Sequence, residues 1–189
     1  MPPASQSEMF PRFTLAQSKL ADEQIEEFYK RYDYDIREFP LEVVFQKFTQ
    51  KDSDGITEWF VPSYQRKHIW SDVQQARFIE SLLINLPIPY VFVSDTGSEA
   101  LIEIIDGSQR IRTIARFIQN NLALENLNRL DKLNGFRFQD LTKATQRRFL
   151  RKTLRTIELR SITEDSRREL FNRLNTGGTT LTGSEKRYG

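Results

Sequence analysis

A polar turn between an apolar run and a helical pattern is the best candidate for chemistry in this sequence. Residues 105–110 read IDGSQR and join the two segments. A strand that ends at Asp106 and a helix that Ser108 caps would leave several backbone N–H groups pointing at one spot. That spot favours an anion such as phosphate, which Gly107 would admit and Arg110 could grip. The plainer alternative is an ordinary capped turn with Arg110 in solvent.

A second polar and aromatic stretch, VPSYQRKHIW, occupies residues 61–70. A nucleobase or sugar could stack on its aromatic rings while a cation holds a phosphate. The side chains that could do this are Tyr64, Gln65, Arg66 and Trp70. Taken singly, Trp70 is better explained as a core anchor, and His68 as a surface or packing residue.

A third stretch, FNRLNTGGTTLTGSEKR, occupies residues 171–187. Asn175 and the glycines after it are typical of a helix end and turn. As a functional alternative, Asn175 and Thr176 could hydrogen-bond a ligand, and Glu185 could bind a metal or position a water molecule.

Charge is distributed unevenly along the chain, although the formal net charge is only +2. Residues 20–42 carry eight acidic and three basic side chains, whereas residues 132–155 carry eight basic side chains against Asp140 alone. The basic segment includes Arg147, Arg148, Arg151 and Lys152. It is either a solvated helix face or a surface for a polyanion such as DNA.

Composition excludes several classes of site. The 189 residues, 38% of them hydrophobic and 29% charged, suit one domain with a sizeable core. The chain has no cysteine and one histidine, which excludes disulfides, thiol chemistry and the usual zinc sites. It also lacks the P-loop and dinucleotide-binding glycine motifs. No apolar leader or membrane-length run is present, so we expect no membrane partner and a cytoplasmic protein.

The order of elements predicts an α+β fold in a single domain, residues 18–189, after a flexible lead, residues 1–17. We expect helices at 18–32, 71–86, 143–153, 164–178 and after Gly107. We expect strands at 56–65, 90–95, 100–106 and 154–162, the middle two forming a hairpin. Residues 40–48 fit a strand or a helix, and residues 133–142 predict a loop with a short strand.

The three polar stretches, in this order, resemble the DGQQR-motif domain at the N-terminus of GmrSD-type (type IV) restriction endonucleases. That domain is grouped with the ParB- and sulfiredoxin-like superfamily, and the resemblance covers roughly residues 38–189. It implies a small mixed sheet with flanking helices, which binds and could hydrolyse a nucleotide to regulate DNA cleavage by a separate nuclease module. Here Ser108 replaces the first glutamine of the motif, and the absence of cysteine excludes sulfiredoxin-like redox chemistry.

The resemblance leads to one functional hypothesis with two alternatives. In the first, nucleotide phosphates and Mg²⁺ bind around the turn, with catalytic roles for Asp106, Gln109, Arg110 and Glu185. Tyr64, Gln65, Arg66, Trp70, Gly107, Ser108, Asn175 and Thr176 would form the nucleotide pocket. The alternatives are a non-catalytic, ParB-like DNA-binding module that uses the basic segment, and a degenerate scaffold. The chain ends soon after Glu185, where relatives usually continue, so we expect the nuclease module on a C-terminal extension or another subunit.

Overall fold

The computed structural model describes residues 13–30, 33–63, 69–97, 100–160 and 162–177, with side chains described up to residue 174. The chain divides into two units, residues 1–33 and 34–189. The first contains one helix, α1 (Leu15–Tyr29), which Thr14 caps and which has no buried residue. This helix begins three residues before the predicted start. No helix in the described part of the chain is long and apolar enough to cross a membrane.

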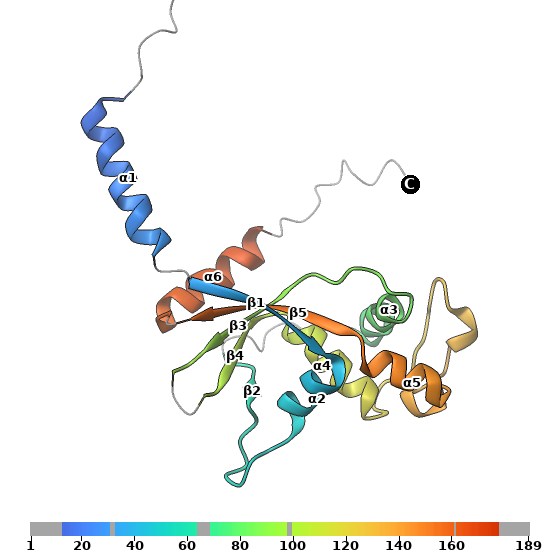
Figure 1. The fold of residues 1–189 in the computed structure, drawn as a ribbon. Helices are drawn as coiled ribbons and strands as arrows, with labels where there is room; N and C mark the ends of the chain where they lie inside the picture. The colour runs from blue at the N-terminus through green and yellow to red at the C-terminus, as the bar shows by residue number, and fades with distance from the viewer. Residues whose placement is uncertain (1–12, 31–32, 64–68, 98–99, 161, 178–189) are drawn as a thin grey trace, which may run out of the picture. The chain divides into compact units, whose positions relative to one another are not determined.

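The second unit contains the remaining elements, apart from the first residue of β1 (Figure 1). Its strands are β1 (Asp33–Pro40), β2 (Trp59–Phe60), β3 (Val91–Asp95), β4 (Ile102–Asp106) and β5 (Thr153–Arg160). Its α-helices are α2 (Leu41–Thr49), α3 (Asp72–Leu83), α4 (Ser108–Ile118), α5 (Lys143–Leu150) and α6 (Glu164–Gly177). Two short 3₁₀ helices, η2 (Asp131–Leu133) and η3 (Phe138–Asp140), lie between α4 and α5.

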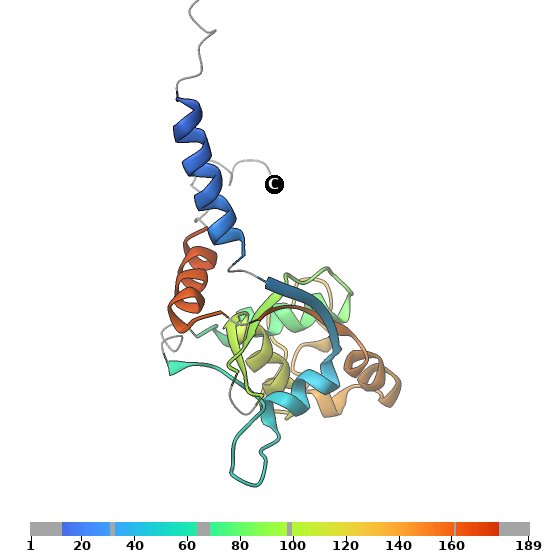
Figure 2. The same cartoon turned by 60° about the vertical axis from the view of Figure 1, so that its left-hand side comes forward.

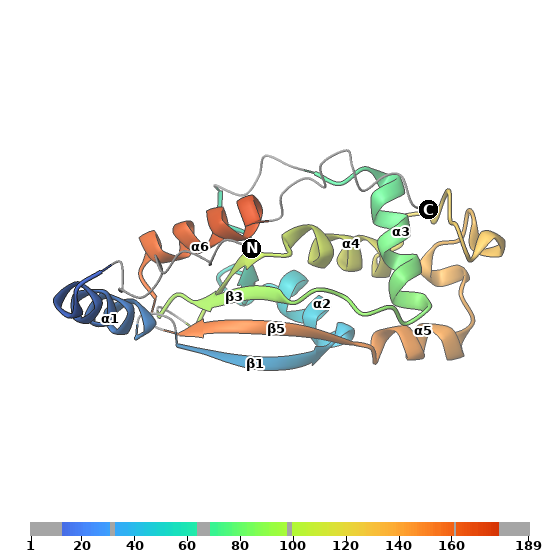
Figure 3. The same cartoon turned by 90° about the horizontal axis from the view of Figure 1, so that it is seen from above.

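The five strands form one mixed sheet in the order β1-β5-β3-β4-β2. β3 and β4 are antiparallel, which confirms the predicted hairpin, whereas β3 with β5 and β2 with β4 are parallel. Figure 3 shows β1, β5 and β3 side by side. The mixed sheet with flanking helices confirms the α+β prediction.

The two faces of the sheet are covered differently. Val91, Val93, Ile104 and Leu154 belong to the main hydrophobic core, in which α2, α3 and α4 pack together. Alternate residues point to the opposite face, where α6 contacts β4 (Figure 2). There Nε of Arg167 lies 3.1 Å from the buried Glu103 carboxylate, an ion pair without hydrogen-bond geometry.

Two buried polar side chains hold the irregular segment between α4 and α5. Glu80 on α3 accepts hydrogen bonds from the backbone N–H groups of residues 128–130, at 2.6–3.2 Å. Gln146 on α5 donates through Nε2 to the carbonyl groups of residues 138, 139 and 141. Phe117, Phe138 and Phe149 pack edge-on or tilted beneath this segment, with ring centroids 5.5–5.9 Å apart.

Several predictions about elements need correction. The ambiguous segment 40–48 is the helix α2, because Leu41 and Val44 must point together into the core. The short strand predicted in residues 133–142 is wrong, since turn hydrogen bonds, a backbone pair with Leu124 and side chains such as Gln146 satisfy that backbone without a strand. In the strand predicted at 56–65, Trp59–Phe60 pairs with β4 and Thr57 forms an isolated bridge with Lys51, and β1 was not predicted at all.

We predict that Glu80→Gln lowers the free energy of unfolding by about 1–3 kcal/mol at pH 7, because an amide replaces a carboxylate that accepts three buried N–H groups. Burial by itself raises the pKa of Glu80. The N–H groups of Leu130, Arg129 and Asn128, with Arg77, outweigh burial and leave the pKa below its ordinary 4.5. The ionised carboxylate therefore stabilises the fold above pH 4.5, and this contribution is lost as the pH falls.

Thermal unfolding from pH 7 to pH 3 measures this effect. The difference in Tm between wild type and Glu80→Gln should shrink below pH 4.5. Glu125→Gln is the control, because Glu125 is exposed and lies in the segment that follows helices α3 and α4. A difference that stays constant across this pH range would contradict the role of the Glu80 charge.

Candidate functional site

The turn between β4 and α4 has the predicted course but a different cap. The strand ends at Asp106 and the helix begins at Ser108, while Gly107 is the N-cap in the left-handed region at φ 91°. The Gly107 carbonyl accepts hydrogen bonds from the N–H groups of Arg110 and Ile111, at 3.0 and 3.2 Å. The prediction that Ser108 caps the helix is therefore wrong. Ser108 already has helical backbone geometry and is buried, whereas an N-cap residue needs an extended backbone.

Packing explains why residue 107 is a glycine. A Cβ atom there would lie 2.7 Å from Cγ2 of Val91 and 3.3 Å from Cζ of Arg110. A side chain would therefore clash with β3 as well as strain the left-handed backbone. The glycine is thus required by the fold, whether or not an anion approaches the turn.

The guanidinium group of Arg110 hydrogen-bonds to other groups of the protein. Its Nη2 donates to Oδ2 of Asp106 at 2.7 Å, and its Nη1 donates to the carbonyl groups of Pro89 and Tyr90 at 2.6 and 2.9 Å. Its side chain is only 14% exposed. Burial lowers the pKa of Arg110 and the Asp106 carboxylate opposes that change, so the group stays charged. Arg110 is therefore not in solvent; it ties the turn to the segment that enters β3.

The second polar stretch meets the turn through Gln109. The backbone N–H of Trp70 donates to Oε1 of Gln109 at 3.2 Å, and the Trp70 carbonyl accepts from Nε2 of Gln75 at 2.8 Å. The Trp70 ring packs edge-on against Phe78, with centroids 5.5 Å apart. Trp70 is thus an anchor that fixes the end of its loop beside the start of α4. Two of the three polar stretches come together here.

A cleft of about 690 Å³ extends from Gln109 along one side of α4. We call it the α4 cleft. One side of the cleft is lined by Phe48 and Thr49, at the end of α2, and by Ile69 and Gln75. α4 lines the other side with Gln109, Arg112, Thr113, Ala115, Arg116 and Gln119. Ile69 is 78% exposed at the cleft, although it is a large apolar side chain. The volume is in the range of small-molecule sites.

The α4 cleft contains two cations that differ in what they already bind. Arg116 donates to Asp72, Gln75 and the Asn121 carbonyl at 2.8–3.1 Å. Arg112 is exposed and has no ion pair or hydrogen bond with the described residues. Our sequence analysis missed Arg112. The spacing of three residues from Gln109, which places both on one helix face, was the signal that could have identified it.

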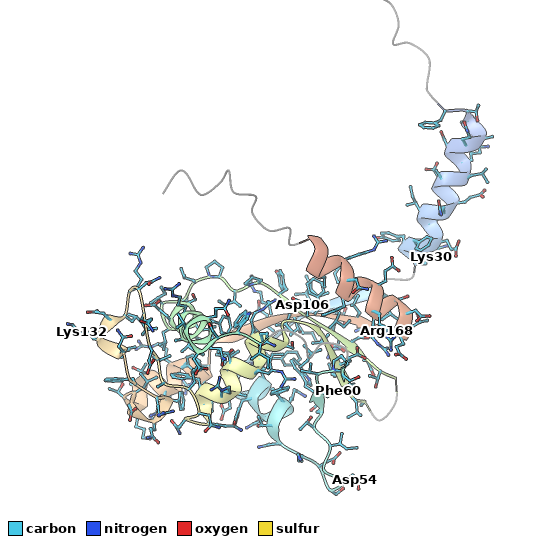
Figure 4. All side chains as sticks on the ribbon, turned by 180° about the vertical axis from the view of Figure 1, so that it is seen from behind. Lys30, Asp54, Phe60, Asp106, Lys132 and Arg168 are labelled. Atoms are coloured by element: carbon cyan, nitrogen blue, oxygen red, sulfur yellow. The ribbon has the colours of Figure 1, made fainter. Side chains whose placement is uncertain are left out.

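Other candidates fall partly outside the described structure. Tyr64, Gln65, Arg66, His68 and Glu185 lie outside the described residues. Asn175 and Thr176 fall within α6 by their backbone, but their side chains are not described. Figure 4 marks Asp106 within the body of the domain, in contrast to Asp54 in the outlying loop before β2.

No group of three acidic, histidine or cysteine side chains in the described part of the chain could hold a metal ion. Asp106, the described member of the predicted Mg²⁺ pair, already uses one oxygen for Arg110.

The four basic candidates line a cavity of their own. Arg147, Arg148, Arg151 and Lys152 face Asn85 across a cavity of about 810 Å³, which shares no lining residue with the α4 cleft. Nζ of Lys152 donates to Oδ1 of Asn85 at 2.9 Å. The predicted clustering of these cations therefore exists, at a place separate from the polar turn.

Comparisons with known proteins identify a family. A family model described as the N-terminal domain of GmrSD restriction endonuclease matches residues 41–188. The match covers the whole sheet except β1 and includes all three polar stretches. Searches of curated proteins and of solved structures gave no match.

We predict that Gly107→Ala destabilises the domain more than Gly135→Ala does. Both glycines have a positive φ, but a Cβ at Gly135 would meet no atom within 4 Å. Gly135→Ala should cost about 1–2 kcal/mol from backbone strain alone. Gly107→Ala should cost about 1–3 kcal/mol more, because of the clash with Val91. Urea unfolding of both variants measures the difference, and equal losses would show that the Val91 contact does not matter.

We also predict that Arg110→Met lowers the free energy of unfolding by about 2–3 kcal/mol, because it leaves two carbonyls and a carboxylate without their donor. Arg112→Met, on the same helix but exposed, should stay within about 0.5 kcal/mol of wild type. Guanidinium unfolding of the two variants side by side provides the measurement. Equal stability of both would rule out Arg110 as a structural clamp.

Proposed function

Because the chain belongs to the family of N-terminal domains of GmrSD restriction endonucleases, which form part of a restriction system acting on DNA, we propose that it is the nucleotide-binding regulatory domain of such a system. The α4 cleft is the proposed nucleotide site. The observation that carries the proposal is the meeting of two predicted motifs, through Trp70 and Gln109, at one end of a cleft large enough for a small ligand.

The chemistry of the α4 cleft suits a nucleotide in two parts. Phe48 and Ile69 offer apolar surface on which a base can rest. Arg112 offers a cation with no acidic partner among the described residues, close to the N-terminal end of α4, where the helix dipole also favours phosphate. The polar stretch 61–70 also contains Tyr64 and Arg66, to which the proposal assigns further contacts with base and phosphate.

The roles first assigned within the turn change under this proposal. Arg110 and Gly107 stabilise the conformation of the turn, and Arg112 instead binds the phosphate. Mg²⁺ enters with the nucleotide phosphates, since one or two carboxylates then suffice and the described residues offer no cage. Asp106 and Glu185 are the carboxylates that the proposal assigns to it.

We predict that Arg112→Gln weakens nucleotide binding at least tenfold, which corresponds to about 1.4 kcal/mol, without lowering Tm. Calorimetric titration with ATP, GTP, CTP and UTP, with and without Mg²⁺, is the measurement. Arg112 is preferred to Arg110 as the probe because its loss should leave the fold intact. Arg147→Gln removes the same charge outside the cleft and should bind the nucleotide as wild type does.

Two results would count against the proposal. One is the absence of saturable binding of any of the four nucleotides at millimolar concentration. The other is saturable binding that Arg112→Gln leaves unchanged, which would move the site away from the α4 cleft.

A further inference from the structure

We propose that a groove between the C-terminal ends of α3 and α5 binds the phosphate backbone of double-stranded DNA, separately from the nucleotide site. One wall is formed by Arg147, Arg148, Arg151 and Lys152, and the other by the residues around Asn85. We call it the basic groove. Figure 3 shows the two helices at the same end of the domain.

The basic groove is continuous over two cavities. The first, of about 810 Å³, and the second, of about 460 Å³, share Asn85, Arg151 and Lys152. The second continues past the segment 86–88 to Thr153 and Arg155. The surface is therefore an extended channel rather than a single pit, as a polymeric ligand requires.

Most of the positive charge in the basic groove has no acidic partner among the described residues. Five cations and no Asp or Glu line its two cavities. Arg155 pairs with Glu38, but Arg147, Arg148 and Arg151 have no acidic partner among the described residues. Several other arginines on the described surface do have acidic partners, as in Arg160 with Asp35, Arg168 with Glu164 and Arg173 with Glu169.

Folding alone accounts for only part of this arrangement. A helix C-terminus favours cations in its last turn, which accounts for Arg147 and Arg148. Spacings of four residues place Arg147 near Arg151 and Arg148 near Lys152, and like charges at that spacing destabilise a helix end. Burial, and then Arg148, lowers the pKa of Lys152, in keeping with crowding of positive charge. A polyanion would relieve this repulsion.

The described groove offers contacts to phosphates rather than to bases. Its cations are long side chains beside apolar residues such as Leu83 and Ile84, and its one amide, Asn85, already accepts from Lys152. Binding through such a surface is independent of base sequence and falls steeply with salt, because each neutralised phosphate releases counterions. Double-stranded DNA fits this chemistry and the restriction family to which the chain belongs.

The test is fluorescence anisotropy of a labelled DNA duplex with the full chain, at several salt concentrations. Arg147→Gln/Arg148→Gln should weaken binding at least tenfold and reduce the salt slope, d log K/d log[salt], by about 1.8 from that of wild type. The matched control is Arg168→Gln/Arg173→Gln, which removes the same charge from paired arginines on α6. It should bind as wild type does, and a second duplex of unrelated sequence should bind equally well.

The proposal is overturned if both double variants lose affinity equally, because net charge and not the groove would then explain binding. It is also overturned if neither double variant loses affinity. A third contrary result would be a free nucleoside triphosphate that displaces the duplex from the wild type but not from the Arg112→Gln variant. Failure here is distinct from failure of the nucleotide site, since Arg147→Gln/Arg148→Gln should keep wild-type nucleotide affinity and Tm.

Discussion

The buried charge of Arg110 is the constraint around which the centre of this domain is organised. A guanidinium group with little exposed surface must find acceptors on all sides, and it finds them in Asp106 and in the Pro89 and Tyr90 carbonyls. These contacts fix where β3 begins relative to where β4 ends. Val91 at the start of β3, and to a lesser degree Arg110, leave no room for a side chain at position 107. This junction sets the direction in which α4 begins.

Buried polar groups perform a similar task at the other end of α4. The irregular segment after α4 contains no strand that could satisfy its backbone. Glu80 from α3 and Gln146 from α5 supply acceptor and donor atoms instead. Because Glu80 lies on α3 and Gln146 lies on α5, the segment between α4 and α5 is hydrogen-bonded to both of these helices.

The sequence predicted those elements whose signals are local. The helical spacing after Gly107 indicates α4, and the capping residue Ser71 indicates the start of α3. The two apolar runs on either side of residues 96–97 likewise indicate the β3–β4 hairpin. Each of these signals can be seen without knowing the rest of the fold. β1 escaped prediction because it is an edge strand with mostly exposed and charged residues, and its contacts with β5, such as Arg155 with Glu38, join residues 117 positions apart. No local pattern shows such pairing.

The same limit applies to the candidate sites. Composition and spacing pointed to the turn and the basic segment as candidate sites, but they could not tell which arginines are bound within the fold itself. Arg110 and Arg116 each bind several acceptors, including the Pro89 carbonyl and Asp72, which lie 21 and 44 positions away, whereas Arg112 and Arg147 have no such partner among the described residues. The distinction matters for function, because a guanidinium group already bound on several sides must give up those contacts before it can hold a ligand phosphate. Function in this domain is therefore best sought at the cations that the fold leaves unpaired, such as Arg112 in the α4 cleft and Arg147 in the basic groove, rather than at Arg110 in the turn.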